Sequence, residues 1–280
     1  MLKARLPQNI DVNGLSFLKI EPSTRSLAVY NVHFALTQAE NVYKVSADRV
    51  LFVNTFCLVA QKECHLLIEN LNVENKDLKV IGVEGRFIIS PGSNEALAGG
   101  LVTIDQIRYN EYLIEQVYSN ITIDNKNVIF DRILARAYQG RLQGEGAYQL
   151  LPKEQITMTL DFKDIDTNRI QSVNSQLRGA LTGQVSYSGT ITSIDSLTVD
   201  FQSPSSEMEK TLLKYLMGNI NDSLAFLPFS KALESADFIH LDNFQGTIHN
   251  AGKDSVDIQL NVNSKQLNLD LNPTITINLR

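Results

Sequence analysis

The chain has 280 residues, of which 43% are hydrophobic and 20% are charged, and this balance is typical of a folded protein. Its net charge of −6 argues against a general nucleic-acid-binding role, because neutralising phosphates requires clustered lysine and arginine. No apolar segment approaches the roughly 20 residues of a membrane helix, and the N-terminus lacks the apolar core of a signal peptide.

The N-terminal part of the chain carries a series of short alternating segments, which strengthen between Val42 and Val73. Such alternation predicts strands with one apolar and one polar face. The clearest loop signal is Ser90–Asn94, and we treat 91–100 as the most flexible point of the chain. The sequence therefore favours one elongated β domain over 1–280, with a possible division into a β region at 1–95 and a second region at 100–280.

The two cysteines, Cys57 and Cys64, lie in two predicted strands that flank a short turn near residues 60–61. In a hairpin centred there they face each other, with Cα atoms about 4.5 Å apart in a non-hydrogen-bonded pair. This separation permits a disulfide, which would place the protein in an oxidising compartment such as a periplasm. The alternative is a pair of half-buried thiols.

The segment from Ile133 to Phe162 shows the most regular alternation in the chain. Leu134 and the even positions from Tyr138 to Leu150 carry large apolar residues or glycine, and the odd positions from Gln139 onward are mostly polar. We interpret this as one long strand, followed after a break by a second strand at 156–162. The pair forms a hairpin with a single apolar side.

The same pattern returns at Leu177–Phe201 and, more weakly, at Phe244–Val262. The result is a degenerate internal repeat with a period of roughly 40 residues. An insertion near 205–233 predicts a short helix, capped by Ser205 and Ser206. Its apolar stripe comprises Met208, Leu212, Leu213, Leu216 and Met217.

These elements predict a mainly β fold: an elongated, strongly curved, largely antiparallel sheet of repeated hairpins, groove-like or taco-like, with one helical insertion. A helix of about 12 residues, ~18 Å long, covers only three or four strands. The remaining apolar faces then need either a second sheet, as in a closed sandwich, or an apolar ligand in an open groove. Glycines on the apolar side favour curvature, although they could also relieve crowding in a closed core; they are Gly140, Gly144, Gly179 and Gly183.

No catalytic or metal-binding pattern is present in the sequence. The four histidines lack metal-ligand spacing, and the acidic segment 161–166 lacks the glycine and glutamate of a calcium loop. There is no GxSxG motif, and neither cysteine belongs to a recognisable catalytic set. We therefore predict a non-enzymatic protein without a cofactor or metal.

The order AYQGRLQGEGAYQL, ITMTLDFKDID, LRGALTGQVSYSGTI and FQGTI resembles the C-terminal region of AsmA-like envelope proteins (the AsmA, TamB and YdbH type). The segment VYKVSADRVLFVNTFCLVAQKECHLLIENLNV is similar to the N-terminal part of that family. The resemblance implies a periplasmic, inner-membrane-anchored protein whose β-groove moves or shields phospholipid. The given sequence departs from the family in two ways: it shows no N-terminal membrane helix, and it is shorter than the long bridging members. The first departure leaves two alternatives open, a cytosolic protein or one from which an anchor or leader was removed.

Together these features predict a protein that binds phospholipid acyl chains on the apolar wall of its sheet, for lipid transport between membranes or outer-membrane homeostasis. An exposed edge strand, above all the last one, could also pair with an envelope partner. The alternative is a closed β-sandwich that serves as a structural or protein-binding module. The predicted wall consists of Tyr138, Leu142, Tyr148, Met158, Leu160, Leu181, Val185, Tyr187, Val199 and Phe201.

Overall fold

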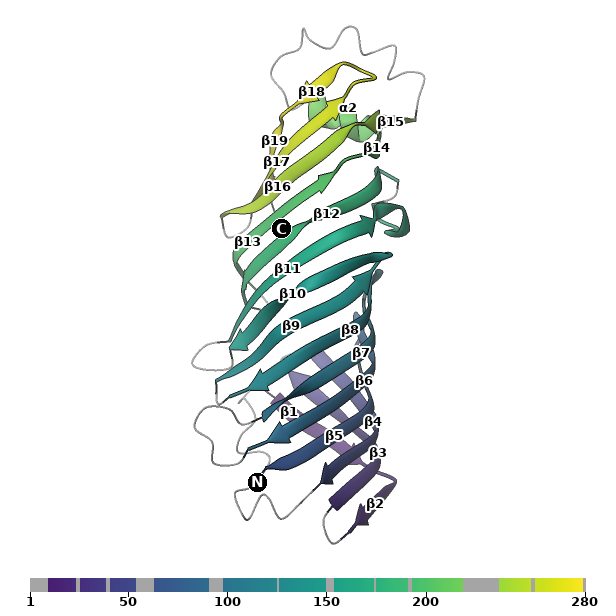
Figure 1. Cartoon of the computed structure of the whole chain (residues 1–280), viewed down its shortest axis with the longest axis vertical. Coiled ribbons are helices and arrows are strands. Elements are labelled where there is room, and N and C mark those ends of the chain that lie inside the picture. Colours follow the sequence, from purple (N-terminus) through teal and green to yellow (C-terminus); the bar gives the residue numbers. More distant parts are fainter. Residues whose placement is uncertain are drawn as a thin grey trace. The chain divides into compact units, whose positions relative to one another are not determined.

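In the described part of the chain, nineteen strands form one open antiparallel sheet, accompanied by one short α-helix (Figure 1). The computed structural model describes residues 10–23, 26–38, 41–53, 63–90, 98–124, 126–149, 154–173, 175–190, 193–218, 237–252 and 255–278. The predicted fold class, a mainly β protein built on a largely antiparallel sheet of hairpins with one helical insertion, is confirmed.

The chain divides into two compact units. Unit 1 comprises Met1–Arg136 and Gly144–Glu154, and unit 2 comprises Ala137–Gln143 and Gln155–Arg280. The predicted division at 91–100 falls inside unit 1, where the strands before and after it pair along their full length. Hydrogen bonding across the two strands therefore keeps that part of the chain in one unit.

Unit 1 is a run of antiparallel hairpins in which each strand pairs with the next one in the chain. Two short strands, β1 and β2, pair in succession along β3 at one edge. From β3 onward the ladder continues strand by strand to β9. The strands are β1 (Ile10–Ser16), β2 (Lys19–Pro22), β3 (Ser26–Gln38), β4 (Asn41–Val53), β5 (Cys64–Glu74), β6 (Leu78–Ile89), β7 (Ala98–Tyr109), β8 (Tyr112–Ile123) and β9 (Asn127–Ala137).

The single long strand predicted from Ile133 onward is wrong. The chain turns at Tyr138 and Gln139, between the end of β9 at Ala137 and the start of β10 (Gly140–Gln149). Both turn residues have positive φ values, 47° and 67°. A two-residue hairpin turn of this kind usually contains Asn-Gly or Asp-Gly, and the absence of that signal explains why the alternation appeared continuous.

Unit 2 repeats the hairpin arrangement, with one departure at its C-terminal end. Strands β11, β12, β13, β16 and β17 pair in that order. Two short strands, β18 and β19, then both pair with β17. The strands are β11 (Gln155–Asp166), β12 (Leu177–Gly189), β13 (Ile194–Ser203), β16 (Asn243–Gly252), β17 (Ser255–Ser264), β18 (Leu269–Leu271) and β19 (Thr274–Asn278), with a 3-10 turn at Thr167–Arg169.

Two short strands and one helix lie beside the start of β12 and cover part of the unit 2 sheet. There β14 (Ser206–Glu209) pairs with β12 and with β15 (Phe238–Leu241), and α2 (Lys210–Gly218) follows β14 directly. The helix begins at Lys210 and not directly after Ser206, so its predicted cap at Ser205 and Ser206 is wrong. The strand ladder, which pairs Ser206 with Gly179 and Leu241, keeps this segment extended.

The carboxylate of Glu209 caps α2 in place of those serines. It accepts hydrogen bonds from the backbone N–H groups of Thr211 (2.7 Å) and Leu212 (3.0 Å). These donors, above all the N–H of Thr211, hold the pKa of Glu209 below its ordinary value. A charged acceptor at this position satisfies amides that the first helical turn leaves without partners.

Candidate functional site

The strand register of unit 2 aligns its apolar side chains in rows that run across the sheet. In the longest row each residue is the direct cross-strand partner of the next, over six strands. Every side chain of this row is half-buried, so part of each remains in contact with solvent. We call it the open row; its members are Leu160, Val185, Val199, Ile248, Ile258 and Ile275.

The neighbouring row alternates bulky residues with glycine: Phe162, Gly183, Phe201, Gly246 and Leu260 are successive partners. A Cβ on Gly183 would lie 2.7 Å from Cζ of Phe162, and one on Gly246 would lie 2.7 Å from Cζ of Phe201. Each ring therefore lies over the glycine of the next strand. These glycines make room for aromatic rings. Glycine within a strand often marks a place where another group approaches the backbone closely.

Among the described residues, cover on this face of the unit 2 sheet comes from α2 and lies at one end. Phe244 (6% exposed), Val262 (0%) and Leu271 (7%) are buried in a cluster with Leu213 and Leu216 of α2. Partly buried residues of the adjoining row, among them Phe201 and Leu260, pack against the margin of this cluster. The same apolar face is thus buried beneath α2 and half-exposed along the open row.

Seven of the predicted wall residues share this face. The register pairs Met158 with Tyr187 and Leu160 with Val185, and it pairs Tyr187 with Leu197 and Val185 with Val199. All seven are half-buried. They are Met158, Leu160, Leu181, Val185, Tyr187, Val199 and Phe201.

The other three predicted wall residues lie elsewhere. Tyr138 occupies the turn before β10, where its backbone is left-handed, so its assignment to a strand wall is wrong. Leu142 lies on the part of β10 that belongs to unit 2, whereas Tyr148 belongs to unit 1. Burial, with a contribution from Glu154, raises the pKa of the Tyr148 hydroxyl.

The four glycines predicted to produce curvature have different surroundings. At Gly140 a Cβ would meet the backbone oxygens of Lys163 and Asp164 at 2.6 and 2.7 Å. Gly179 has a φ of 146° and lies against Ser206 of β14, where the cover begins. Gly183 makes room for a ring, and Gly144 belongs to the part of β10 in unit 1.

Sequence reasoning missed several residues of this face, among them Phe162, Ile248, Ile258 and Ile275. Their alternation is visible in the sequence, but the predicted wall takes its residues from the two stronger repeats and omits Phe162 even there. Only the register shows that the weaker third repeat continues the same rows.

Unit 1 has an apolar face of the same construction. A row of direct partners crosses seven strands, and all its residues are half-buried. Here too a ring lies over glycine, because a Cβ on Gly85 would be 2.6 Å from Cε2 of Phe87. The row consists of Leu27, Phe52, Leu66, Phe87, Gly100, Ile121 and Phe130.

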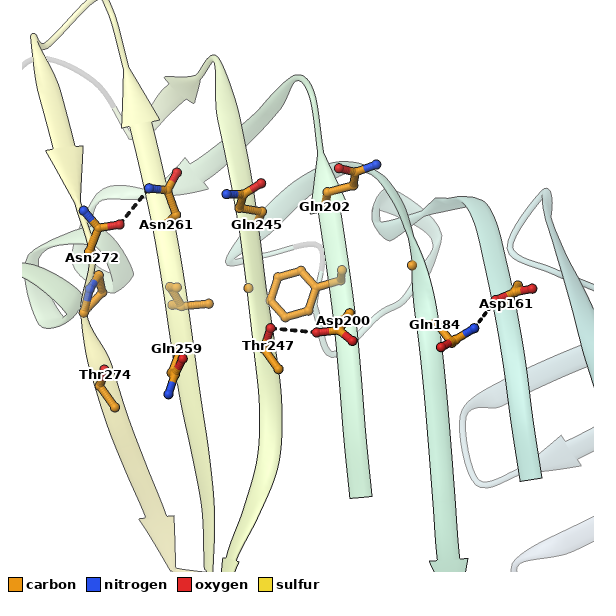
Figure 2. Close-up of a pocket in the computed structure, with 15 residues that line it drawn as sticks. Asp161, Gln184, Asp200, Gln202, Gln245, Thr247, Gln259, Asn261, Asn272 and Thr274 are labelled. Carbon is orange, nitrogen blue, oxygen red and sulfur yellow. Dashed lines mark hydrogen bonds between the residues drawn. The ribbon is translucent and has the colours of Figure 1, made fainter. Parts of the chain in front are cut away.

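The opposite, polar face of the unit 2 sheet is hollowed. The hollow has a volume of about 820 Å³ and is lined mainly by amide, hydroxyl and carboxylate side chains (Figure 2). Two polar ladders flank it. The first consists of Asp161, Gln184, Asp200, Thr247, Gln259 and Thr274, and the second of Gln202, Gln245, Asn261 and Asn272.

Hydrogen bonds within the ladders fix several of these side chains. The amide of Gln184 donates to Asp161 (2.7 Å) and the hydroxyl of Thr247 donates to Asp200 (2.7 Å). In the second ladder, the amide of Asn261 donates to Oδ1 of Asn272 (2.7 Å). Figure 2 shows the first two pairs on neighbouring strands, and it shows Asn261 beside Asn272, which follows β18 directly.

The predicted disulfide falls partly outside the described residues. Cys64 is buried at the start of β5, with 3% exposure, and its sulfur belongs to a disulfide. Cys57 lies outside the described residues, so its pairing with Cys64 stays a prediction. Among the described residues, no group of three or more His, Cys, Asp or Glu side chains is placed to hold a metal ion.

None of the helices in the described part of the chain has the length and apolar character needed to cross a bilayer. No protein-family model, curated protein or solved structure matches this chain. The resemblance to AsmA-like proteins therefore rests on the sequence motifs alone.

Proposed function

We propose that this protein is a non-enzymatic lipid-binding protein of the cell envelope, which holds acyl chains against the apolar face of its sheet. The observation that carries the proposal is the open row of unit 2, in which six aliphatic side chains are aligned across six strands and each is half-buried, with part of its surface in contact with solvent. A continuous apolar surface of this kind on a soluble protein commonly marks a binding site.

The energetics of such a surface suit an acyl chain. Burying a Val, Leu or Ile side chain completely contributes about 1.5–3 kcal/mol, so covering the exposed part of a half-buried one contributes a fraction of that, at most on the order of 1 kcal/mol. The open row and its neighbours can together supply several times that amount. Because the hydrophobic effect is non-directional, this face would select an extended apolar chain rather than a particular headgroup.

The glycine–aromatic row supports the same assignment. The rings of Phe162 and Phe201 lie over Gly183 and Gly246, which have no side chains of their own. The apolar surface along this row is therefore flat. A level apolar strip beside the open row provides room for a hydrocarbon chain lying across the strands. In unit 1 the ring of Phe87 lies over Gly85 of its own strand instead.

The cellular context of the proposal is a periplasm, in a protein anchored to the inner membrane that carries phospholipid between membranes or maintains the outer membrane. Two features support it: the sequence resemblance to AsmA-like proteins, and the disulfide at Cys64, since disulfides persist in oxidising compartments.

Uptake of a phospholipid with a fluorescent acyl chain from phosphatidylcholine vesicles tests the proposal. Val199→Glu places a charge in the open row, and Thr198→Glu places the same charge on the opposite face of the same strand. We expect the wild type and Thr198→Glu to take up the lipid and Val199→Glu to take up little. Equal uptake by the two variants, or none by the wild type, would overturn the proposal.

A further inference from the structure

The polar hollow of unit 2 has an unusual composition. None of the described residues that line it is lysine, arginine or histidine, and its only charged side chains are Asp161 and Asp200. The next row on the same face, Thr159, Ser186, Thr198, His249, Asp257 and Thr276, is also mostly hydroxylated. The hollow is therefore lined mainly by neutral hydrogen-bonding groups, together with two carboxylates.

The polar face of unit 1 is different, although it belongs to the same kind of sheet. Direct partners there are charged: Lys44 faces Glu74, and Glu74 faces Lys79. Arg49 and Glu69 form an ion pair on the same face. Mixed charges of this sort keep an exposed sheet soluble, so the amides of unit 2 are not required by solubility alone.

The lining determines which ligands suit the hollow. Phosphates and other anions need cationic or clustered N–H donors, and two carboxylates would repel them. An apolar chain would leave the amides without hydrogen-bond partners, at a cost in free energy. A hydroxyl-rich, uncharged ligand matches best, because hydroxyls and amides both donate and accept hydrogen bonds.

The arrangement of the amides adds a preference for an extended ligand. Gln202, Gln245 and Asn261 lie on successive strands, which are about 4.8 Å apart. Between the two ladders lies the row that includes Gly183 and Gly246, and its backbone forms the base of the hollow. The side chains of Phe201 and Leu260 in this row lie on the apolar face. An extended β-linked polysaccharide places successive rings at a similar spacing.

We propose that the polar hollow of unit 2 binds an uncharged, extended polysaccharide that lies across the strands, between the two amide-bearing ladders. The amides of Gln202, Gln245 and Gln259 are exposed and contact the sugar, while the hydrogen-bonded pairs Gln184–Asp161 and Asn261–Asn272 hold the margins of the site. This site is on the face opposite to the lipid-binding rows, and it does not depend on them.

The test is an NMR titration of the side-chain amide resonances with an uncharged hexamer of β-1,4-linked N-acetylglucosamine, at concentrations up to the millimolar range. We expect saturating shifts for the ladder amides and none in unit 1. The double variant Gln202→Ala/Gln245→Ala lowers the affinity at least about fivefold, because hydrogen bonds to the sugar are lost. Asn120→Ala, which removes an exposed amide of unit 1, leaves the affinity unchanged.

Four outcomes would overturn the proposal: no shift at millimolar sugar, the same affinity in the double variant, tighter binding of heparin at these amides, or self-association that the double variant abolishes. The last outcome would identify the hollow as a contact between copies of the chain. Circular dichroism of the double variant confirms that its sheet is intact before the affinities are compared.

Discussion

Two parts of one apolar face in unit 2 differ in their cover. Phe244, Val262 and Leu271 are buried with α2, whereas the open row on the same strands is half-exposed. The residue types are alike in both parts, and the strands that carry them are continuous. The difference shows that an alternating pattern fixes which face is apolar, while a separate element of the chain decides whether that face is buried.

The largest effect is expected from a charge placed beneath α2. Val262→Asp buries a carboxylate at a position with 0% exposure, which should destabilise unit 2 by more than about 4 kcal/mol because no partner compensates the charge. Gln259→Asp, at an exposed position on the opposite face of the same strand, is the matched control and should change stability little. Chemical denaturation measures both, and a similar loss in the two variants would contradict the assigned faces.

The second-largest loss of stability is expected when a buried side chain of α2 is shortened. Leu213→Ala leaves a cavity at a fully buried position of α2 and should cost about 2–5 kcal/mol. Lys214→Ala, at an exposed position of the same helix, should leave the unfolding midpoint almost unchanged. If Leu213→Ala were as stable as Lys214→Ala, the helix would not be packed on the sheet as described.

A smaller effect is expected where rings lie over glycine. Gly183→Ala places a Cβ 1.9 Å from the backbone oxygen of Asp200 and 2.7 Å from Cζ of Phe162, and relieving such overpacking typically costs about 1–3 kcal/mol. Combining it with Phe162→Leu should recover part of that loss, since the smaller side chain frees space beside the new methyl group. Strictly additive losses in this double-mutant cycle would show that the ring and the glycine are not in contact.

The smallest effect concerns the helix cap. The pKa of Glu209 is lowered in the folded protein, so its contribution to stability is complete above its unfolded-state pKa and is lost as the pH falls through the folded-state value. Glu209→Gln should therefore melt slightly below the wild type at pH 7, and the two melting temperatures should converge at acidic pH. A difference that persisted unchanged at low pH would exclude a charge-based cap.

The sequence predicted the hairpins, the apolar face and the helical insertion because each depends on local periodicity. It missed the turn at Tyr138, since positive φ values there come without the usual Asn-Gly signal. It also misplaced the helix cap, because the pairing of Ser206 with Gly179 and Leu241 is a long-range contact that capping propensity does not include.

The candidate sites also depend on long-range strand pairing, which local sequence patterns do not predict. Seven of ten wall residues share one face, as alternation predicted, but Ile248, Ile258 and Ile275 joined the row only through the register of strands far apart in the chain. The polar hollow was not predicted at all. Its residues are ordinary solvent-facing positions in sequence, and their alignment into two ladders requires the strand order.

Native mass spectrometry of the purified protein, with organic extraction of the same sample, tests most directly whether acyl chains occupy the open row. We expect bound phospholipid in the wild type and in Ser186→Glu, and its loss from Val185→Glu, which should remain folded because Val185 is half-exposed. Lipid-free wild-type protein, together with unfolding of Val185→Glu, would instead indicate a closed apolar core and would contradict lipid binding.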